Sequence, residues 1–368
     1  MPVIEFEGVR KRYGRNVVLD DLTATMDEGA FNVVLGPPAS GKSVLLRVLT
    51  GLEAPDAGHV SIAGQRMDGV APGDRNVGYV PQSFALYPHY SVLDNITYPL
   101  RLAGSSKRDA REAAERIAAM LRIDKLLGKM PNQLSGGEKQ RVAIARGIVK
   151  DTDLFVLDDP LTGLDFKLRE QLFDDLRDMR RTLGATFVYT TSEPLESLVL
   201  ADTIHILYAG RIVESGAVDE VYRSPRHLRS IEQLGFPASN VLDGTVSDEG
   251  GHLACRTTLF SVPVTMATGK RPPRDGASVR VAIRPEHLRL ERPAGDAVCA
   301  VQAEVVLAED LGGELVVHLA AQGVRITTVV RHDRALELNG GQVELYLRHE
   351  DVVVFDTDAL QAVARGGV

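Results

Sequence analysis

Residues 36–43 read GPPASGKS and fit the spacing G-x-x-x-x-G-K-[ST] of a phosphate-binding loop. In such a loop the backbone N–H groups turn toward phosphate oxygens, and the helix that follows adds the positive end of its dipole. Lys42 is expected to reach the β- and γ-phosphates of a nucleotide, and the Ser43 hydroxyl to bind Mg²⁺. The residues predicted to bind the nucleotide here are Gly36, Pro37, Ala39, Ser40, Gly41, Lys42, Ser43 and Val44. A glycine turn before a helix, without any ligand, is the alternative.

Two carboxylates, Asp158 and Asp159, end the apolar segment LFVLDD. Sheets of α/β proteins place their ligands at the carboxyl ends of strands. We expect Asp158 to hold Mg²⁺, directly or through water, and Asp159 to orient or activate the attacking water. A solvated acidic turn before Pro160 is the alternative reading of this segment.

A sheet is needed to position these residues. The first part of the chain has the sequence pattern of a sheet with helices between its strands. The apolar segment FNVVL (31–35) precedes the phosphate loop, and SVLLRVLTGL (43–52) after it has the apolar spacing of a helix. Further strand-like segments alternate with amphipathic helical patterns, which is typical of the α/β class. The strands are predicted at 154–159 and 185–191, and the helices at 106–127 and 166–183.

From about residue 236 the helical periods give way to short β-type segments separated by turn residues. These segments are 278–283, 297–306, 314–319, 324–330 and 342–347. The pattern predicts a small all-β barrel or sandwich. We therefore predict two domains, residues 1–235 and 236–368. The last residues, AVARGGV, are expected to be frayed.

Composition excludes some classes of protein. The net charge of −8 argues against a nucleic-acid partner, which usually meets a basic face. No segment of about 18 apolar residues is present, and the N-terminus lacks the apolar core of a signal peptide, so a cytoplasmic location is expected. Cys255 and Cys299 have no metal or redox spacing and are expected to be reduced and structural.

A third segment, LSGGEKQRVAIARG at 134–147, leads to a family resemblance. A serine, two glycines and a following helix form a second anion-binding helix N-terminus, although a glycine-rich turn that caps an ordinary helix is the alternative. Together with the two earlier motifs, this segment resembles the signature motif of ABC transporter ATPases, with Glu138 where Gln is commoner. The resemblance implies that two ATPase subunits sandwich two ATP molecules. The residues that would cap the γ-phosphate bound by the partner are Ser135, Gly136, Gly137 and Glu138.

The resemblance assigns roles to residues outside these motifs. Tyr13 matches the aromatic residue that stacks on adenine, and Gln82 matches the glutamine that touches Mg²⁺ and the reacting water. The aromatic-rich stretch after Gln82 matches the surface that receives coupling helices of membrane subunits. The implied fold is a P-loop NTPase nucleotide-binding domain with a helical subdomain at about 84–150. An OB-like regulatory domain would follow it.

Within the family the best match is to ATPases of carbohydrate importers of the maltose and glycerol-3-phosphate type. The segments VAIRPEHLRL (281–290) and LAEDLGGELVVHL (307–319) match the regulatory domain of that subfamily. The likeness implies ATP and Mg²⁺ as cofactors and two transmembrane permease subunits as partners. It also implies an indirect role for an extracytoplasmic solute-binding protein and a peripheral position on the cytoplasmic face of the inner membrane.

Two positions depart from the family pattern. Asp159 stands where the family usually has Glu, and a shift of the carboxylate by about 1 Å can cost about a hundredfold in rate. In YTTSEP (189–194), Ser192 stands where the family usually has the histidine that contacts the γ-phosphate. Losing one such polar contact can cost about a hundredfold or more. Asp159, Gln82 and Ser192 are thus the predicted catalytic positions, and Ser43, Gln82 and Asp158 the predicted metal positions.

The leading hypothesis is an ATPase subunit that energises an importer for a carbohydrate or polyol, such as glycerol, glycerol-3-phosphate or an oligosaccharide. The two departures, and a likeness to glycerol importers with two different ATPases, favour the impaired member of a heterodimeric pair, with a homodimer as the alternative. A nucleotide-binding regulatory subunit with negligible hydrolysis at its own site is a second hypothesis. A third, an ABC ATPase of DNA repair or translation, fits poorly with the acidic composition and the C-terminal β-rich part.

Overall fold

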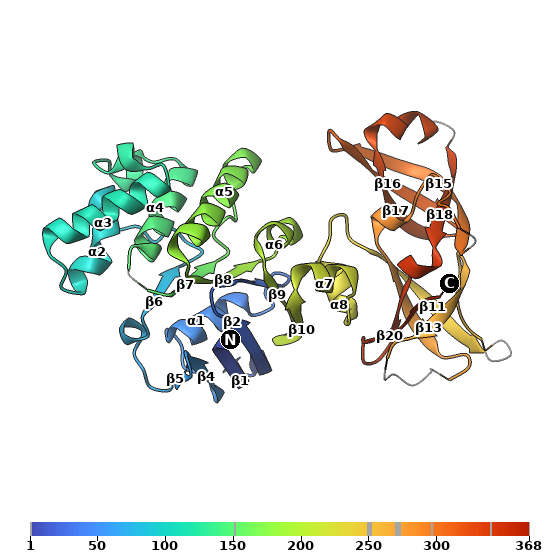
Figure 1. Ribbon diagram of the computed structural model, residues 1–368, viewed down its shortest axis with the longest axis horizontal. Helices are drawn as coiled ribbons and strands as arrows, with labels where there is room; N and C mark the ends of the chain where they lie inside the picture. The colour runs from blue at the N-terminus through green and yellow to red at the C-terminus, as the bar shows by residue number, and fades with distance from the viewer. Residues whose placement is uncertain are drawn as a thin grey trace. The chain divides into compact units, whose positions relative to one another are not determined.

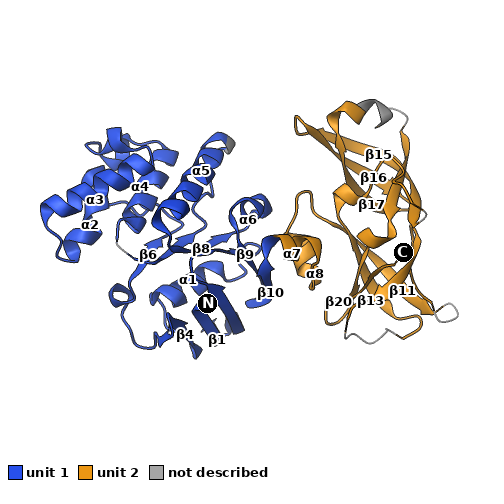
Figure 2. Cartoon of the chain, viewed as in Figure 1, with its two compact units in different colours: residues 1–218 blue, residues 219–368 orange. Residues whose placement is uncertain are grey.

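In the computed structural model the chain divides into two units, residues 1–218 and 219–368 (Figure 2). The structure describes residues 2–150, 152–248, 252–268, 274–295, 297–338 and 341–367. The division lies earlier than the boundary predicted at 235/236. Helices α7 (Val218–Arg223) and α8 (Leu228–Gln233) belong with the second unit, because Leu228 and Ile231 pack against Phe355 of that unit.

Unit 1 is built on a six-stranded sheet in the order β10-β9-β3-β8-β7-β6. Strands β3, β6, β7, β8 and β9 run parallel, and β10 is antiparallel to β9. Parallel strands covered on both faces are almost continuously apolar, which explains why every residue of β3 and β7 is buried. The bounds are β3 (Phe31–Leu35), β6 (Val77–Val80), β7 (Leu154–Asp158), β8 (Thr186–Thr191), β9 (Thr203–Tyr208) and β10 (Arg211–Ala217). The predicted α/β core is confirmed.

A second, antiparallel sheet in unit 1 has the strand order β2-β1-β4-β5. Its apolar side chains share a core with helix α1 (Lys42–Thr50) and with strands of the first sheet. The bounds are β1 (Pro2–Tyr13), β2 (Asn16–Asp27), β4 (Ala57–Ile62) and β5 (Gln65–Arg66). Helix α1 is thus fixed between the two sheets.

Helices α2 (Val92–Leu102), α3 (Lys107–Met120) and α4 (Gly136–Ile148) gather at one end of unit 1 (Figure 1). The helix predicted at 106–127 ends earlier than expected. Arg122 has a left-handed φ of 56°, which a helix does not accommodate, and only a short 3₁₀ turn, Asp124–Leu126, follows.

Helix α5 (Phe166–Leu183) has the predicted bounds, and the shorter α6 (Pro194–Leu200) follows β8. The Asp165 side chain caps the start of α5 by accepting a hydrogen bond from the backbone N–H of Leu168 at 3.0 Å. Gly184, with φ of 59°, ends the helix in the left-handed conformation that favours glycine. Among the described residues, no helix is long and apolar enough to cross a membrane.

After α7 and α8, unit 2 contains a closed barrel, β11-β12-β13-β20-β19-β14, and a four-stranded sheet, β17-β16-β15-β18. One apolar core joins them, with Val281 of the barrel and Leu345 of the sheet both fully buried. The barrel strands are β11 (Asn240–Asp248), β12 (Leu253–Thr257), β13 (Ser261–Met266), β14 (Ser278–Ile283), β19 (Val353–Asp356) and β20 (Ala362–Gly366). The sheet strands are β15 (Val298–Asp310), β16 (Glu314–Ala321), β17 (Val324–Arg331) and β18 (Gln342–Arg348). The predicted all-β C-terminal domain is confirmed.

The chain end differs from the expectation. Residues 362–366 were expected to be frayed, but they form β20, which pairs with β13 and β19 and closes the barrel. Both cysteines are free thiols, and burial raises the pKa of Cys255 to about 11.

Candidate functional site

A cavity of about 630 Å³ in unit 1 lies where parallel strands of the first sheet end. Its lining includes Lys42 and Ser43 after β3, Asp159 after β7 and Ser192 after β8. The complete lining is Asn16, Val18, Pro38, Ala39, Gly41, Lys42, Ser43, Val44, Gln82, Asp159, Thr162, Gly163, Arg169, Ser192 and Glu193. The fold therefore brings together residues from four distant motifs that sequence analysis singled out.

The phosphate loop is held in a fixed shape by backbone conformation and by its lysine. Gly41 precedes α1 with φ of 108°, and Ala39 also has a left-handed φ of 64°. The Nζ of Lys42 donates to the carbonyl oxygens of Gly36 at 2.6 Å and Pro37 at 3.0 Å. Burial lowers the pKa of Lys42, while the nearby charges of Asp159 and Asp158 act in the opposite direction. The loop thus holds a buried cation next to acidic side chains.

Some residues of this loop pack behind the cavity lining, and others line the cavity. A Cβ at Gly36 would lie 2.6 Å from the carbonyl oxygen of Leu207 and 2.7 Å from the Oγ of Ser40, so the position accepts only glycine without rearrangement. The Oγ of Ser40 is buried and has no hydrogen-bond partner. Ser40 lies off the cavity lining, so the loop residues that face a ligand in the cavity include Ala39, Gly41, Lys42 and Ser43.

Two of the three residues predicted to hold Mg²⁺, Ser43 and Asp158, contact each other. The Ser43 hydroxyl donates to Oδ1 of Asp158 at 3.0 Å, and the Thr190 hydroxyl donates to the same oxygen at 3.0 Å. Burial raises the pKa of Asp158, against the effect of these two hydrogen bonds. Magnesium in phosphoryl-transfer sites is usually held by one or two carboxylates together with substrate phosphates. One hydroxyl and one buried carboxylate, with Gln82 on the same cavity, match that requirement.

Asp159 is held in place by a residue that sequence analysis missed. Its backbone N–H donates to the carbonyl oxygen of Thr190 at 3.1 Å, and its φ is 44°, which is uncommon for a residue other than glycine. The Thr162 hydroxyl donates to Oδ1 of Asp159 at 2.6 Å. The signal that could have identified Thr162 is its position three residues after Asp159, since a turn brings side chains at that spacing together.

The cavity wall near Ser192 contains a second group of residues without a predicted role. Arg169 and Glu193 line the cavity beside Ser192. Behind them, the buried carboxylate of Glu196 accepts hydrogen bonds from the hydroxyls of Tyr189 at 2.7 Å and Thr191 at 2.6 Å. Burial raises the pKa of Glu196.

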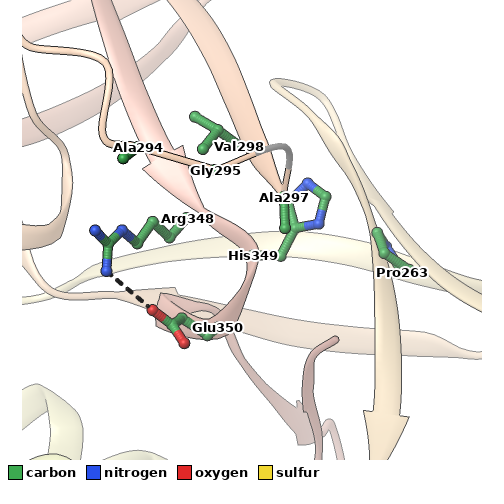
Figure 3. A pocket seen from close by; sticks show the side chains of 8 residues that line it. All are labelled: Pro263, Ala294, Gly295, Ala297, Val298, Arg348, His349 and Glu350. Carbon is green, nitrogen blue, oxygen red and sulfur yellow. Dashed lines mark hydrogen bonds and ion pairs between the residues drawn. The ribbon is translucent and has the colours of Figure 1, made fainter. Parts of the chain in front are cut away.

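Unit 2 contains a cavity of a different character, with a volume of about 560 Å³ (Figure 3). It is lined by Pro263, Ala294, Gly295, Ala297, Val298, Arg348, His349 and Glu350. Its charged groups, Arg348 and Glu350, are directed toward each other at 3.2 Å. None of the residues predicted to bind nucleotide or metal lines it, so the cavity of unit 1 is the candidate site.

Comparison with known proteins places this chain among transport ATPases. Residues 19–162 match the ABC transporter family, and residues 281–355 match the TOBE domain family. The sn-glycerol-3-phosphate import ATP-binding protein UgpC of Chromohalobacter salexigens is 35% identical over 343 residues, which cover 93% of this chain and 90% of that protein. The maltose/maltodextrin import ATP-binding protein MalK of Escherichia coli is 35% identical over 347 residues, covering 93% and 92%. The chain belongs to the ATP-binding subunits of ABC importers of the carbohydrate type.

Solved structures agree with this family assignment. A dimeric ATP-binding cassette in a post-hydrolysis state, bound to ADP and phosphate, matches with a TM-score of 0.54 and 27% identity. The match covers 58% of this chain and 98% of that structure. The nucleotide-binding fold expected for this ABC subunit is therefore confirmed.

The signature residues of this ABC subunit lie outside the cavity of unit 1. Ser135 caps α4, its Oγ accepting from the N–H of Glu138 at 3.3 Å, while the Glu138 carboxylate accepts from the N–H of Ser135 at 2.7 Å. This hydrogen bond from the Ser135 backbone is the main cause of a lowered pKa of Glu138. A Cβ at Gly137 would lie 2.8 Å from a methyl carbon of Leu168, which favours glycine there, while Gly136 has open space around it.

Three residues of the phosphate loop and one distant aromatic residue also lie off the lining. Gly36, Pro37 and Ser40 shape the loop from behind. Tyr13 is 45% exposed, and its hydroxyl donates to the carboxylate of Glu53. The stacking of Tyr13 on adenine stays a prediction.

Proposed function

We propose that this chain binds ATP with Mg²⁺ in the cavity of unit 1 and that its own site turns ATP over slowly. The observation that supports binding is the arrangement at the phosphate loop, where Lys42 donates to loop carbonyls and Ser43 donates to Asp158. Gln82 and Asp159 line the same cavity. When bound, Mg²⁺ supplies the positive charge that neutralises phosphate oxygens.

The residues of the chain divide the chemistry among them. Lys42 and the loop bind the phosphates, and Ser43 with Asp158 would hold the metal ion. The Asp159 carboxylate, oriented by Thr162, is the available base or water-positioning group, and Gln82 is the neighbouring amide. The side chain of Asp159 is one methylene shorter than the glutamate usual in the family, and Ser192 carries no charge. Both differences support slow turnover.

We propose an asymmetric pair of ATPase subunits in which this chain contributes the impaired site. Its serine and glycines at the start of α4 would complete a competent site on a different ATPase chain. The remaining partners would be two transmembrane permease subunits and, indirectly, an extracytoplasmic solute-binding protein. The chain would then lie at the cytoplasmic face of the inner membrane.

In such a complex the solute would be selected by the binding protein and the membrane subunits, and not by residues of this chain. The relatives are named for import of sn-glycerol-3-phosphate and of maltose or maltodextrin. We propose a carbohydrate or polyol as the solute class.

Native mass measurement of the membrane complex, purified through a tag on this chain, tests the proposal. We expect one copy of this chain, one copy of a second ATPase and two permease subunits. Two copies of this chain would contradict the asymmetric pair, and Asp159 would then have to position water without a neighbouring histidine. Purification without any membrane subunit would contradict the importer assignment.

A further inference from the structure

The cavity wall around Ser192 carries a cation that the motifs of the sequence do not include. Arg169 lies in the first turn of α5, where its backbone N–H donates to the carbonyl oxygen of Asp165 at 3.0 Å. Its side chain lines the cavity together with Asp159 and Ser192. Among the residues that line this cavity, Lys42 and Arg169 are the two with a permanent positive charge.

The Arg169 guanidinium is not fixed by hydrogen bonds to the carboxylates around it. Its Nη1 lies 4.0 Å from the Glu193 carboxylate and its Nε 3.9 Å from Oε1 of Glu196, both beyond hydrogen-bond distance. The Nε atom is buried and has no hydrogen-bond partner. The other oxygen of Glu196, Oε2, already accepts from two hydroxyls. Because Nε is buried, a ligand in the cavity would contact the terminal Nη groups of Arg169.

Arg169 is the group at this end of the cavity that can attract an anionic part of a ligand. Lys42 is held by hydrogen bonds to two loop carbonyls, so its positive charge lies at the loop end of the cavity. The region near Asp159 and Ser192 contains two carboxylates, Asp159 and Glu193, and the neutral Ser192 hydroxyl, and Arg169 is the residue there with a permanent positive charge. A guanidinium presents parallel N–H donors that match two oxygens of a phosphate group.

We propose that Arg169 binds the terminal phosphate of the bound nucleotide triphosphate and supplies the positive charge that Ser192 cannot. This inference rests on the proposed function, because it requires nucleotide in the unit 1 cavity. It makes Arg169 a residue that distinguishes ATP from ADP. It also predicts that a histidine at 192 and Arg169 have overlapping roles.

Equilibrium binding to the full-length chain tests the inference. The dissociation constants of Mg²⁺–ATPγS and Mg²⁺–ADP are measured for the wild type, Arg169→Gln, Arg169→Lys and the control Arg177→Gln. Arg177 lies on the same helix but is exposed and donates to the Val199 carbonyl at 3.0 Å, away from the cavity lining. Arg169→Gln should weaken ATPγS binding about tenfold to a hundredfold and change ADP binding less than about twofold. Arg177→Gln should change neither.

Two further variants keep the inference falsifiable if Arg169→Gln folds poorly. Arg169→Lys retains charge without the planar donor pair and should give an intermediate loss for ATPγS alone. Adding Ser192→His to Arg169→Gln should restore part of the lost ATPγS affinity. Equal losses for both nucleotides, or no loss for either, would overturn the role of Arg169. If the wild type binds neither nucleotide, the proposed function itself fails.

Discussion

The two ends of the nucleotide cavity are constructed differently. At the phosphate-loop end, Lys42 donates to two loop carbonyls at 2.6 and 3.0 Å, and Ser43 donates to Asp158 at 3.0 Å. At the other end, which is formed by Asp159, Ser192 and Arg169, the ion pairs of Arg169 are near 4 Å and the family's usual side chains are replaced. In our proposal the phosphate-loop end supplies most of the nucleotide binding, while the other end contacts the terminal phosphate and limits turnover.

The largest effect should come from the phosphate-loop end. Lys42→Ala removes the buried cation and leaves the carbonyls of Gly36 and Pro37 without their donor. We expect ATP affinity to fall roughly a hundredfold or more, because charged hydrogen bonds to phosphate are lost. Equilibrium binding of Mg²⁺–ATP measures this. Lys107→Ala, at an exposed position on α3, is the matched control. Unchanged affinity in Lys42→Ala would mean that nucleotide does not use this loop.

The next effect should come from restoring the family's residues at the other end. Asp159→Glu combined with Ser192→His should raise ATP turnover of the purified chain about tenfold or more, with little change in affinity. Steady-state kinetics separates kcat from KM. A double variant no faster than the wild type would indicate that these two substitutions do not limit the rate.

A smaller effect is expected at the residue that orients Asp159. Thr162→Val keeps the shape of the side chain but removes the donor to the buried Asp159 carboxylate. The free energy of unfolding should fall by about 1–2 kcal/mol, and turnover should fall about fivefold. Urea unfolding and kinetics of Thr162→Val and Thr162→Ser give the comparison. Because Thr162→Ser retains the hydroxyl, equal losses in both variants would argue against the hydrogen bond.

The smallest effect concerns the signature helix. Glu138→Gln removes a negative charge near the start of α4 but keeps an oxygen that can accept from the N–H of Ser135. Thermal unfolding should be almost unchanged, and the ATP-dependent association of subunits should strengthen about twofold. Weaker association would indicate that the carboxylate contributes a contact of its own.

Sequence patterns predicted what is local and missed what the tertiary fold assembles. The phosphate loop and the bounds of α5 follow from spacing within a single segment, so both could be read directly. Arg169 lies within that same helix, where an arginine usually lies on a solvated face. Its place on the cavity lining depends on the tertiary fold, which puts the start of α5 near the ends of β7 and β8. The prediction of a frayed end was wrong for residues 362–366 for a similar reason, since the partners of β20 are distant strands.

The most direct test of slow turnover at this chain's own site is ATP hydrolysis by the assembled transporter with one acidic residue changed at a time. Asp159→Asn in this chain should leave turnover of the transporter within about twofold of the wild type, because we expect the site on the second ATPase to carry most of the hydrolysis. The corresponding change in the second ATPase subunit should abolish turnover. Loss of turnover with Asp159→Asn, while the change in the second subunit is tolerated, would contradict the asymmetric pair.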